Sequence, residues 1–168
     1  MADERTQPSP VAVGAALVGA ALLIVSAFLV WGSLDIRIGT ISEKGTDSAA
    51  GLAVIALGVA IVALLIGWFA GLPPRFVRVC WGLFGLAAVG LAIYALIQIN
   101  NAPRDFFNNL GVNGFLNDIG IDESDVSGVA SKIVSVNYGA GVFVAMAGGI
   151  ATLVAALVGG RARDVTAQ

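Results

Sequence analysis

The sequence predicts an all-α integral membrane protein in which four transmembrane helices form one antiparallel bundle. Two observations predict this class. Four apolar runs, each long enough to cross about 30 Å of hydrocarbon as a helix, contain no charged side chain. The chain is also 58% hydrophobic and only 12% charged, whereas a soluble domain usually carries about 25% charged residues. The predicted membrane segments are 11–31, 49–70, 79–99 and 139–158.

The first apolar run is interpreted as an uncleaved anchor, although its position near the N-terminus also suits a signal peptide. Signal peptides have an apolar core of roughly 7–15 residues followed by small residues at the cleavage site. The run at 11–31 is longer, and its end at Phe28 and Trp31 is bulky. We therefore expect it to remain as the first membrane helix.

The first outer loop, 32–48, contains a short predicted β element. Leu34, Ile36 and Ile38 alternate with polar residues, and alternation with a period of two is typical of a strand with one covered face. A strand needs a partner for its backbone groups, which we expect from the second outer loop or from another protein. Ile36 and Ile38 are therefore candidate partner-contact residues.

The orientation is predicted from the basic residues, which concentrate on the cytoplasmic side of membrane proteins. The short turn 71–78 contains Arg75 and Arg78, and the tails 1–10 and 159–168 carry further arginines. The two longer loops on the other side carry most of the acidic residues. We expect both termini in the cytoplasm and the chain in the plasma (inner) membrane of a bacterium. The short turn also makes the second and third segments antiparallel neighbours.

The second outer loop, 100–138, is too long to be structureless and is predicted to form amphipathic helices. One is expected to begin at Pro103, and a second, with apolar residues from Val126 to Val134 at helical spacing, leads into the fourth membrane segment as a lid helix. The first part of the loop carries apolar side chains that are candidates for contact with a partner. These residues are Phe106, Phe107, Leu110 and Phe115.

The acidic cluster in this loop has two readings. Asp118, Asp122, Glu123 and Asp125 lie close together in the sequence, and hard cations such as calcium bind several carboxylate oxygens. The cluster lacks the alternating acidic pattern of a calcium-binding loop. Acids are also favourable at the start of a helix, so we interpret the cluster as helix capping and keep a cation site as the alternative.

Small residues and aromatic residues complete the predicted membrane domain. Helices in a bilayer associate through small residues, and Gly141, Ala145 and Gly149 recur every four residues in the fourth segment. Tryptophan and tyrosine prefer the headgroup level. The predicted interface anchors are Trp31, Trp68, Trp81 and Tyr138.

Residue usage excludes several classes of function. There is no histidine and a single cysteine, Cys80, which excludes zinc sites, haem attachment and Cys/His nucleophiles. The net charge of −2 argues against a nucleic-acid partner, which needs a basic surface. We expect no cofactor and no enzyme activity.

The first functional hypothesis is a non-catalytic accessory or scaffold subunit of a bacterial envelope assembly. It would act through its outer loops and helix packing, with membrane lipids and either another membrane protein or further copies of itself as partners. One alternative is a small pore, a lipid-binding bundle or a phage-type holin or exclusion protein. Another is an extracytoplasmic sensor.

Overall fold

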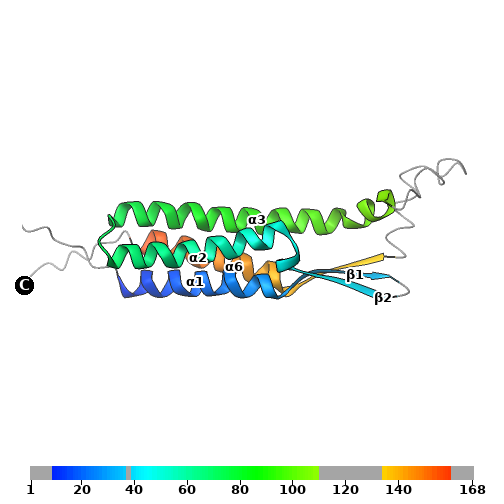
Figure 1. Ribbon diagram of the computed structural model, residues 1–168, viewed down its shortest axis with the longest axis horizontal. Helices are drawn as coiled ribbons and strands as arrows, with labels where there is room; N and C mark the ends of the chain where they lie inside the picture. Colours follow the sequence, from blue (N-terminus) through cyan, green and yellow to red (C-terminus); the bar gives the residue numbers. More distant parts are fainter. Residues whose placement is uncertain (1–8, 37–38, 110–133, 160–168) are drawn as a thin grey trace, which may run out of the picture.

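The computed structural model describes residues 9–36, 39–109 and 134–159. It is mostly helical, with four helices long and apolar enough to cross a membrane and one small three-stranded sheet. The helices lie side by side, and the sheet lies beyond one end of them (Figure 1). The elements in chain order are α1 (Pro10–Phe28), β1 (Val30–Ile36), β2 (Gly39–Lys44), the 3-10 turn η1 (Gly45–Asp47), α2 (Ala49–Phe69), α3 (Pro74–Asn109), β3 (Val134–Tyr138) and α6 (Ala140–Val158).

Serine side chains cap the first two helices. The Ser9 hydroxyl accepts a hydrogen bond from the Ala12 backbone N–H at 3.1 Å, and Ser48 accepts one from Gly51 at 3.1 Å. Such caps satisfy backbone donors that have no partner inside the first turn of a helix. They fix where each apolar segment begins.

The connection between α2 and α3 is a tight turn that begins at a glycine. Gly71 has φ of 107°, and the backbone N–H of Leu72 donates to the Gly67 carbonyl at 2.9 Å. This geometry is a Schellman motif, which ends helices at a residue with positive φ. Pro74 then begins α3, because its fixed φ suits the first helical position. The third helix therefore starts before the predicted boundary at Val79.

Helix α3 is also longer at its other end than the sequence indicated. Its 36 residues correspond to about 54 Å, which exceeds the hydrocarbon thickness of about 30 Å. The helix continues past Ile99 and through Pro103 to Asn109. The short helix expected to begin at Pro103 is thus the end of α3, which extends beyond the other helices alongside the sheet (Figure 1).

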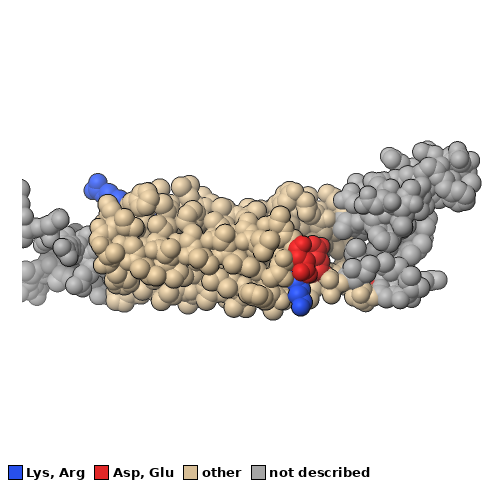
Figure 2. Space-filling view, viewed as in Figure 1, with Lys and Arg blue, Asp and Glu red and all other residues tan. Residues whose placement is uncertain are grey.

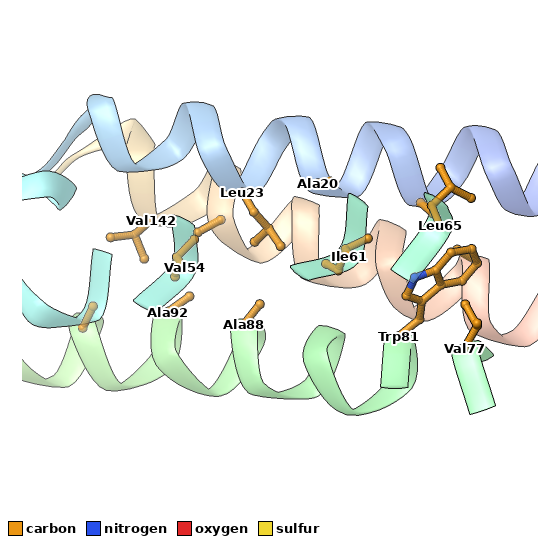
Figure 3. Close-up of a cluster of buried hydrophobic side chains, with 14 of the residues drawn as sticks. Ala20, Leu23, Val54, Ile61, Leu65, Val77, Trp81, Ala88, Ala92 and Val142 are labelled. Atoms are coloured by element: carbon orange, nitrogen blue, oxygen red, sulfur yellow. The ribbon is translucent and has the colours of Figure 1, made fainter. Parts of the chain in front are cut away.

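The interior between the helices is filled by apolar side chains. Leu23, Val54, Ile61, Trp81 and Val142 are fully buried and lie along the space between the helices in Figure 3. Alanines of α1 and α3 lie beside them and let the helices approach closely. The core is therefore continuous along the length of the helices.

The outward faces of the helices are largely apolar, and exposed charged residues lie toward their ends. Phe28, Ile66, Leu86, Phe143 and Leu157 are each more than half exposed. In Figure 2, basic and acidic residues are visible only toward the two ends of the described surface. Monomeric soluble proteins rarely expose apolar surface of this extent.

Candidate functional site

The three-stranded sheet is the largest described structure outside the apolar part of the helices. Its strand order is β2-β1-β3, and both pairings are antiparallel. The predicted strand in the first loop is confirmed as far as Ile36. It begins earlier than expected, at Val30 inside the predicted membrane segment 11–31, and residues 39–44 form a second strand. Strand β1 pairs with both β2 and residues 134–138. One of its two partner strands, β3, comes from the second outer loop, which was one of the two expected sources of a partner.

Strand β3 corrects the end of the predicted lid helix. Val134 and Ser135 were expected to continue that helix, but both lie in β3. The segment Val134–Tyr138 alternates β-branched and polar residues, which suits a strand. Pairing with β1 satisfies its backbone groups. The rest of the predicted lid helix, from Val126, lies outside the described residues.

One side of the sheet carries short polar residues. The register aligns Ser33 with Ser42 and Asn137 in one row, and residues aligned across strands lie on the same face. In the next row the Asp35 carboxylate accepts hydrogen bonds from the Thr40 hydroxyl and, at 2.8 Å, from the Asn137 side-chain amide. This polar network connects all three strands.

The other side of the sheet lies toward α3. A Cβ atom added to Gly32 would meet the Ile99 side chain at 3.1 Å, so the central strand passes close to the helix. Tyr138 is aligned with Gly32 in the sheet, and its hydroxyl donates a hydrogen bond to Asn100 Oδ1 at 3.5 Å. Both contacts place the sheet beside α3, just before the helix extends beyond its neighbours.

Trp31 joins the sheet to the helices. Its side chain is only 3% exposed, and its indole N–H donates to the Ser26 carbonyl at 2.8 Å. Gly45 and Gly141 lie against the indole ring, where any side chain would clash. The Trp31 carbonyl accepts from the Gly139 N–H at 2.8 Å. One residue therefore contacts α1, η1 and the chain entering α6.

The predicted anchors differ in their surroundings. Trp31, Trp68 and Trp81 are all buried, and the rings of Trp68 and Trp81 meet edge to face with centroids 5.5 Å apart. These three rings contact protein rather than the outside of the molecule. Tyr138 is 48% exposed, and its location at the headgroup level stays a prediction.

The predicted packing residues lie where α6 meets its neighbours. Gly141 contacts Trp31, and a Cβ on Gly149 would lie 2.9 Å from Val89 of α3. Ala145 is fully buried. A further close contact joins Gly148 to Gly19 of α1, where an added Cβ would lie 2.9 Å from the Gly19 carbonyl oxygen.

The candidate contact residues are distributed around the sheet and the end of α3. Ile36 is aligned with Gly39 and Val134 in the sheet. Phe106 and Phe107 lie in the last turns of α3. The remaining candidates, and the acidic cluster of the second loop, lie outside the described residues. These are Ile38, Leu110, Phe115, Asp118, Asp122, Glu123 and Asp125.

The polar side chains that the structure describes form hydrogen bonds within and between neighbouring elements. Within residues 9–36, 39–109 and 134–159, no three acidic, histidine or cysteine side chains lie close enough to hold a metal ion. Cys80 is partly buried on α3 and is not in a disulfide. The Asp35 network is the main polar arrangement, and it holds strands together.

Comparisons of the chain with known protein families, with curated protein sequences and with solved structures gave no match. The function is therefore inferred from the geometry of the chain itself.

Proposed function

We propose that the four helices cross one bilayer as an antiparallel bundle, with the sheet on one side and the α2–α3 turn on the other. The largely apolar outward faces and the length of each helix support insertion. Arg75 and Arg78 at the start of α3 support a cytoplasmic location for that end. The sheet would then lie outside the plasma (inner) membrane of a bacterium, with both termini inside.

In this arrangement the protein functions by contact, as an accessory or scaffold subunit of an envelope assembly. The single observation that carries this proposal is the junction at Trp31, whose contacts join the sheet to the bundle beside the extended end of α3. Strands β2 and β3 form the two edges of the sheet, and a sheet edge can pair with a strand of another protein. A bundle joined to such a sheet suits a docking function.

A pore through a single chain is a weaker proposal. Leu23, Ile61 and Trp81 fill the space between the helices and are fully buried, which leaves an apolar, close-packed interior in the described part of the bundle. A transport function would need a path formed by several copies.

The contact proposal is tested by cross-linking in intact cells followed by purification from mild detergent. Phe106→Ser and Phe107→Ser should each lower recovery of a cross-linked membrane protein partner, because each replaces a large apolar residue in the last turns of α3 with a small polar one. Phe76→Ser is the matched control, since Phe76 is exposed at the opposite end of the same helix. Equal recovery with all three variants would contradict the proposal.

A further inference from the structure

The end of the bundle at the α2–α3 turn carries positive charge. Arg75 and Arg78 lie in the first two turns of α3, and Figure 2 shows basic but no acidic residues at this end of the described surface. The acidic residues in the described part of the chain belong to the sheet, to η1 and to the last turns of α3. These are Asp35, Glu43, Asp47 and Asp105. The two arginines are therefore a full helix length away from every described carboxylate.

The two tails of the chain do not change the net charge of this end. Helix α1 begins and α6 ends at the same end of the bundle as the α2–α3 turn (Figure 1). The tails 1–8 and 160–168 contribute equal numbers of basic and acidic side chains. These are Arg5, Arg161 and Arg163 against Asp3, Glu4 and Asp164. The excess positive charge therefore comes from Arg75 and Arg78.

Arg78 is positioned by contacts with two helices. Its Nε–H donates to the Pro74 carbonyl at 3.2 Å, and its Cδ would lie 3.3 Å from a Cβ added to Gly159 at the end of α6. Within residues 9–36, 39–109 and 134–159, this is the only hydrogen bond of either arginine side chain. A guanidinium has five N–H donors in a rigid fork that fits the oxygens of a phosphate. Most of these donors therefore remain to bind an anion.

An exposed apolar surface continues from the arginines toward the middle of α3. Val79, Leu83 and Leu86 are 61%, 59% and 61% exposed. Residues three or four apart share one face of a helix, and this spacing links them to Arg75 and Arg78. We call these five residues the α3 amphipathic face. Its order, positive charge at the helix end and apolar side chains beyond it, complements an amphiphile with an anionic head.

We propose that the α3 amphipathic face binds an anionic phospholipid, with the phosphate at Arg75 and Arg78 and an acyl chain along the apolar residues. The proposal rests on the proposed membrane insertion, which places the first turn of α3 at the headgroup level. Arginine donates two parallel hydrogen bonds to a phosphate, and basic residues near the membrane surface attract anionic lipids. Phosphatidylcholine has the same phosphate, but its choline cation offsets the charge. An inorganic phosphate would contact only the arginines.

The first test measures the lipid preference of the full-length chain by native mass spectrometry in mild detergent. The unaltered chain should bind phosphatidylglycerol about tenfold or more tightly than phosphatidylcholine, since each arginine contributes about fivefold. Arg75→Gln combined with Arg78→Gln should abolish this preference. Lys44→Gln is the matched control, because it removes the same charge from an exposed residue at the sheet end. Equal binding of both lipids to the unaltered chain, or the same loss with Lys44→Gln, would overturn the proposal.

The second test separates the phospholipid from other occupants of the arginines. Arg78→Lys keeps the charge but loses the fork of donors, so it should weaken phosphatidylglycerol binding several-fold. Millimolar inorganic phosphate should not displace the lipid. Displacement by inorganic phosphate, or unchanged binding by Arg78→Lys, would contradict the proposed contact. A lipid preference that arises only when the tail acids are neutralised would show that the tails occupy the arginines, and would also overturn it. Those substitutions are Asp3→Asn, Glu4→Gln and Asp164→Asn.

One control separates this proposal from the membrane assignment. A chain that stays in the membrane after alkaline extraction, but shows no preference for phosphatidylglycerol, would overturn the lipid site and leave the proposed function standing. A chain that is released by alkaline extraction would overturn the membrane insertion, and the lipid site with it.

Discussion

Glycines in the α1–α6 contact show how closely two helices pack at a single residue. Gly148 lies against Gly19 and Leu23, and an added Cβ would lie 2.9 Å from the Gly19 carbonyl oxygen. The Thr152 hydroxyl, one turn along α6, is buried and donates to the Gly148 carbonyl at 2.9 Å. Backbone atoms on both helices leave no space for a side chain there.

Substitution of Gly148 by valine should therefore destabilise the fold. The new side chain would force α1 and α6 apart, and such overpacking costs about 1–3 kcal/mol. Gly14→Val is the control, because Gly14 has nothing within 4 Å. Unfolding by SDS in mixed micelles should show a lower midpoint for Gly148→Val only. Similar midpoints for the two variants would show that α1 and α6 are not in close contact at this position.

Trp31 gives a second prediction at the level of one residue. Trp31→Phe replaces the indole by a smaller ring and removes the hydrogen bond to the Ser26 carbonyl, which should cost about 1–3 kcal/mol. Trp31→Ala should cost about 3–5 kcal/mol, because the cavity lies between three elements.

The control for this series is Tyr138→Phe, which removes only an exposed 3.5 Å hydrogen bond and should change stability by less than about 0.5 kcal/mol. The same SDS titration measures all three variants. A Trp31→Ala effect as small as that of Tyr138→Phe would argue against Trp31 as the joint between sheet and bundle.

Residue-level features differed in how far the sequence could predict them. The four-residue spacing of Gly141, Ala145 and Gly149 predicted a packing face, because helical periodicity alone places them together. The role of Trp31 could not be predicted this way. A tryptophan after an apolar run suits a headgroup position, and only the fold brings the Ser26 carbonyl to its indole N–H.

At the level of elements, the register of the sheet makes a direct prediction. Ser33 faces Asn137 across β1 and β3, so Ser33→Cys with Asn137→Cys, in a Cys80→Ala background, should form a disulfide on mild oxidation. Ser33→Cys with Val136→Cys should not, because adjacent strand residues point to opposite faces. The shift in gel mobility on reduction measures both. Cross-linking of the second pair instead would mean that β3 is shifted by one residue.

Strand β3 was not predicted from the sequence, because its first residues fit two patterns. Val134 fits both the helical spacing that begins at Val126 and the alternation that runs to Tyr138. Short apolar segments are ambiguous between helix and strand. The choice depends on β1, which lies about a hundred residues earlier in the chain and offers an unpaired edge.

The length of helix α3 was underestimated for a different reason. Residues 100–103, Asn-Asn-Ala-Pro, resemble a helix end, since proline removes a backbone donor and disfavours helix at the preceding residue. In the structure α3 passes through Pro103, and its ribbon bends near this end (Figure 1). Proline is a common cause of such bends.

At the level of the whole molecule, composition predicted the main division of the chain. Four uncharged segments became four helices with apolar outward faces, because helix length and the absence of charge can be read locally. The arrangement of the sheet against α3 depends on contacts between distant segments, such as Gly32 with Ile99. Those contacts have no local signature in the sequence.

The central claim is that the sheet and the α2–α3 turn lie on opposite sides of a bilayer. It is tested most directly by a membrane-impermeant maleimide applied to intact cells expressing single-cysteine variants in a Cys80→Ala background. Ser42→Cys, exposed on β2, should be labelled before the membrane is permeabilised, and Arg75→Cys, exposed at the start of α3, only afterwards. Labelling of both cysteines at the same stage, or of Arg75→Cys first, would contradict the account.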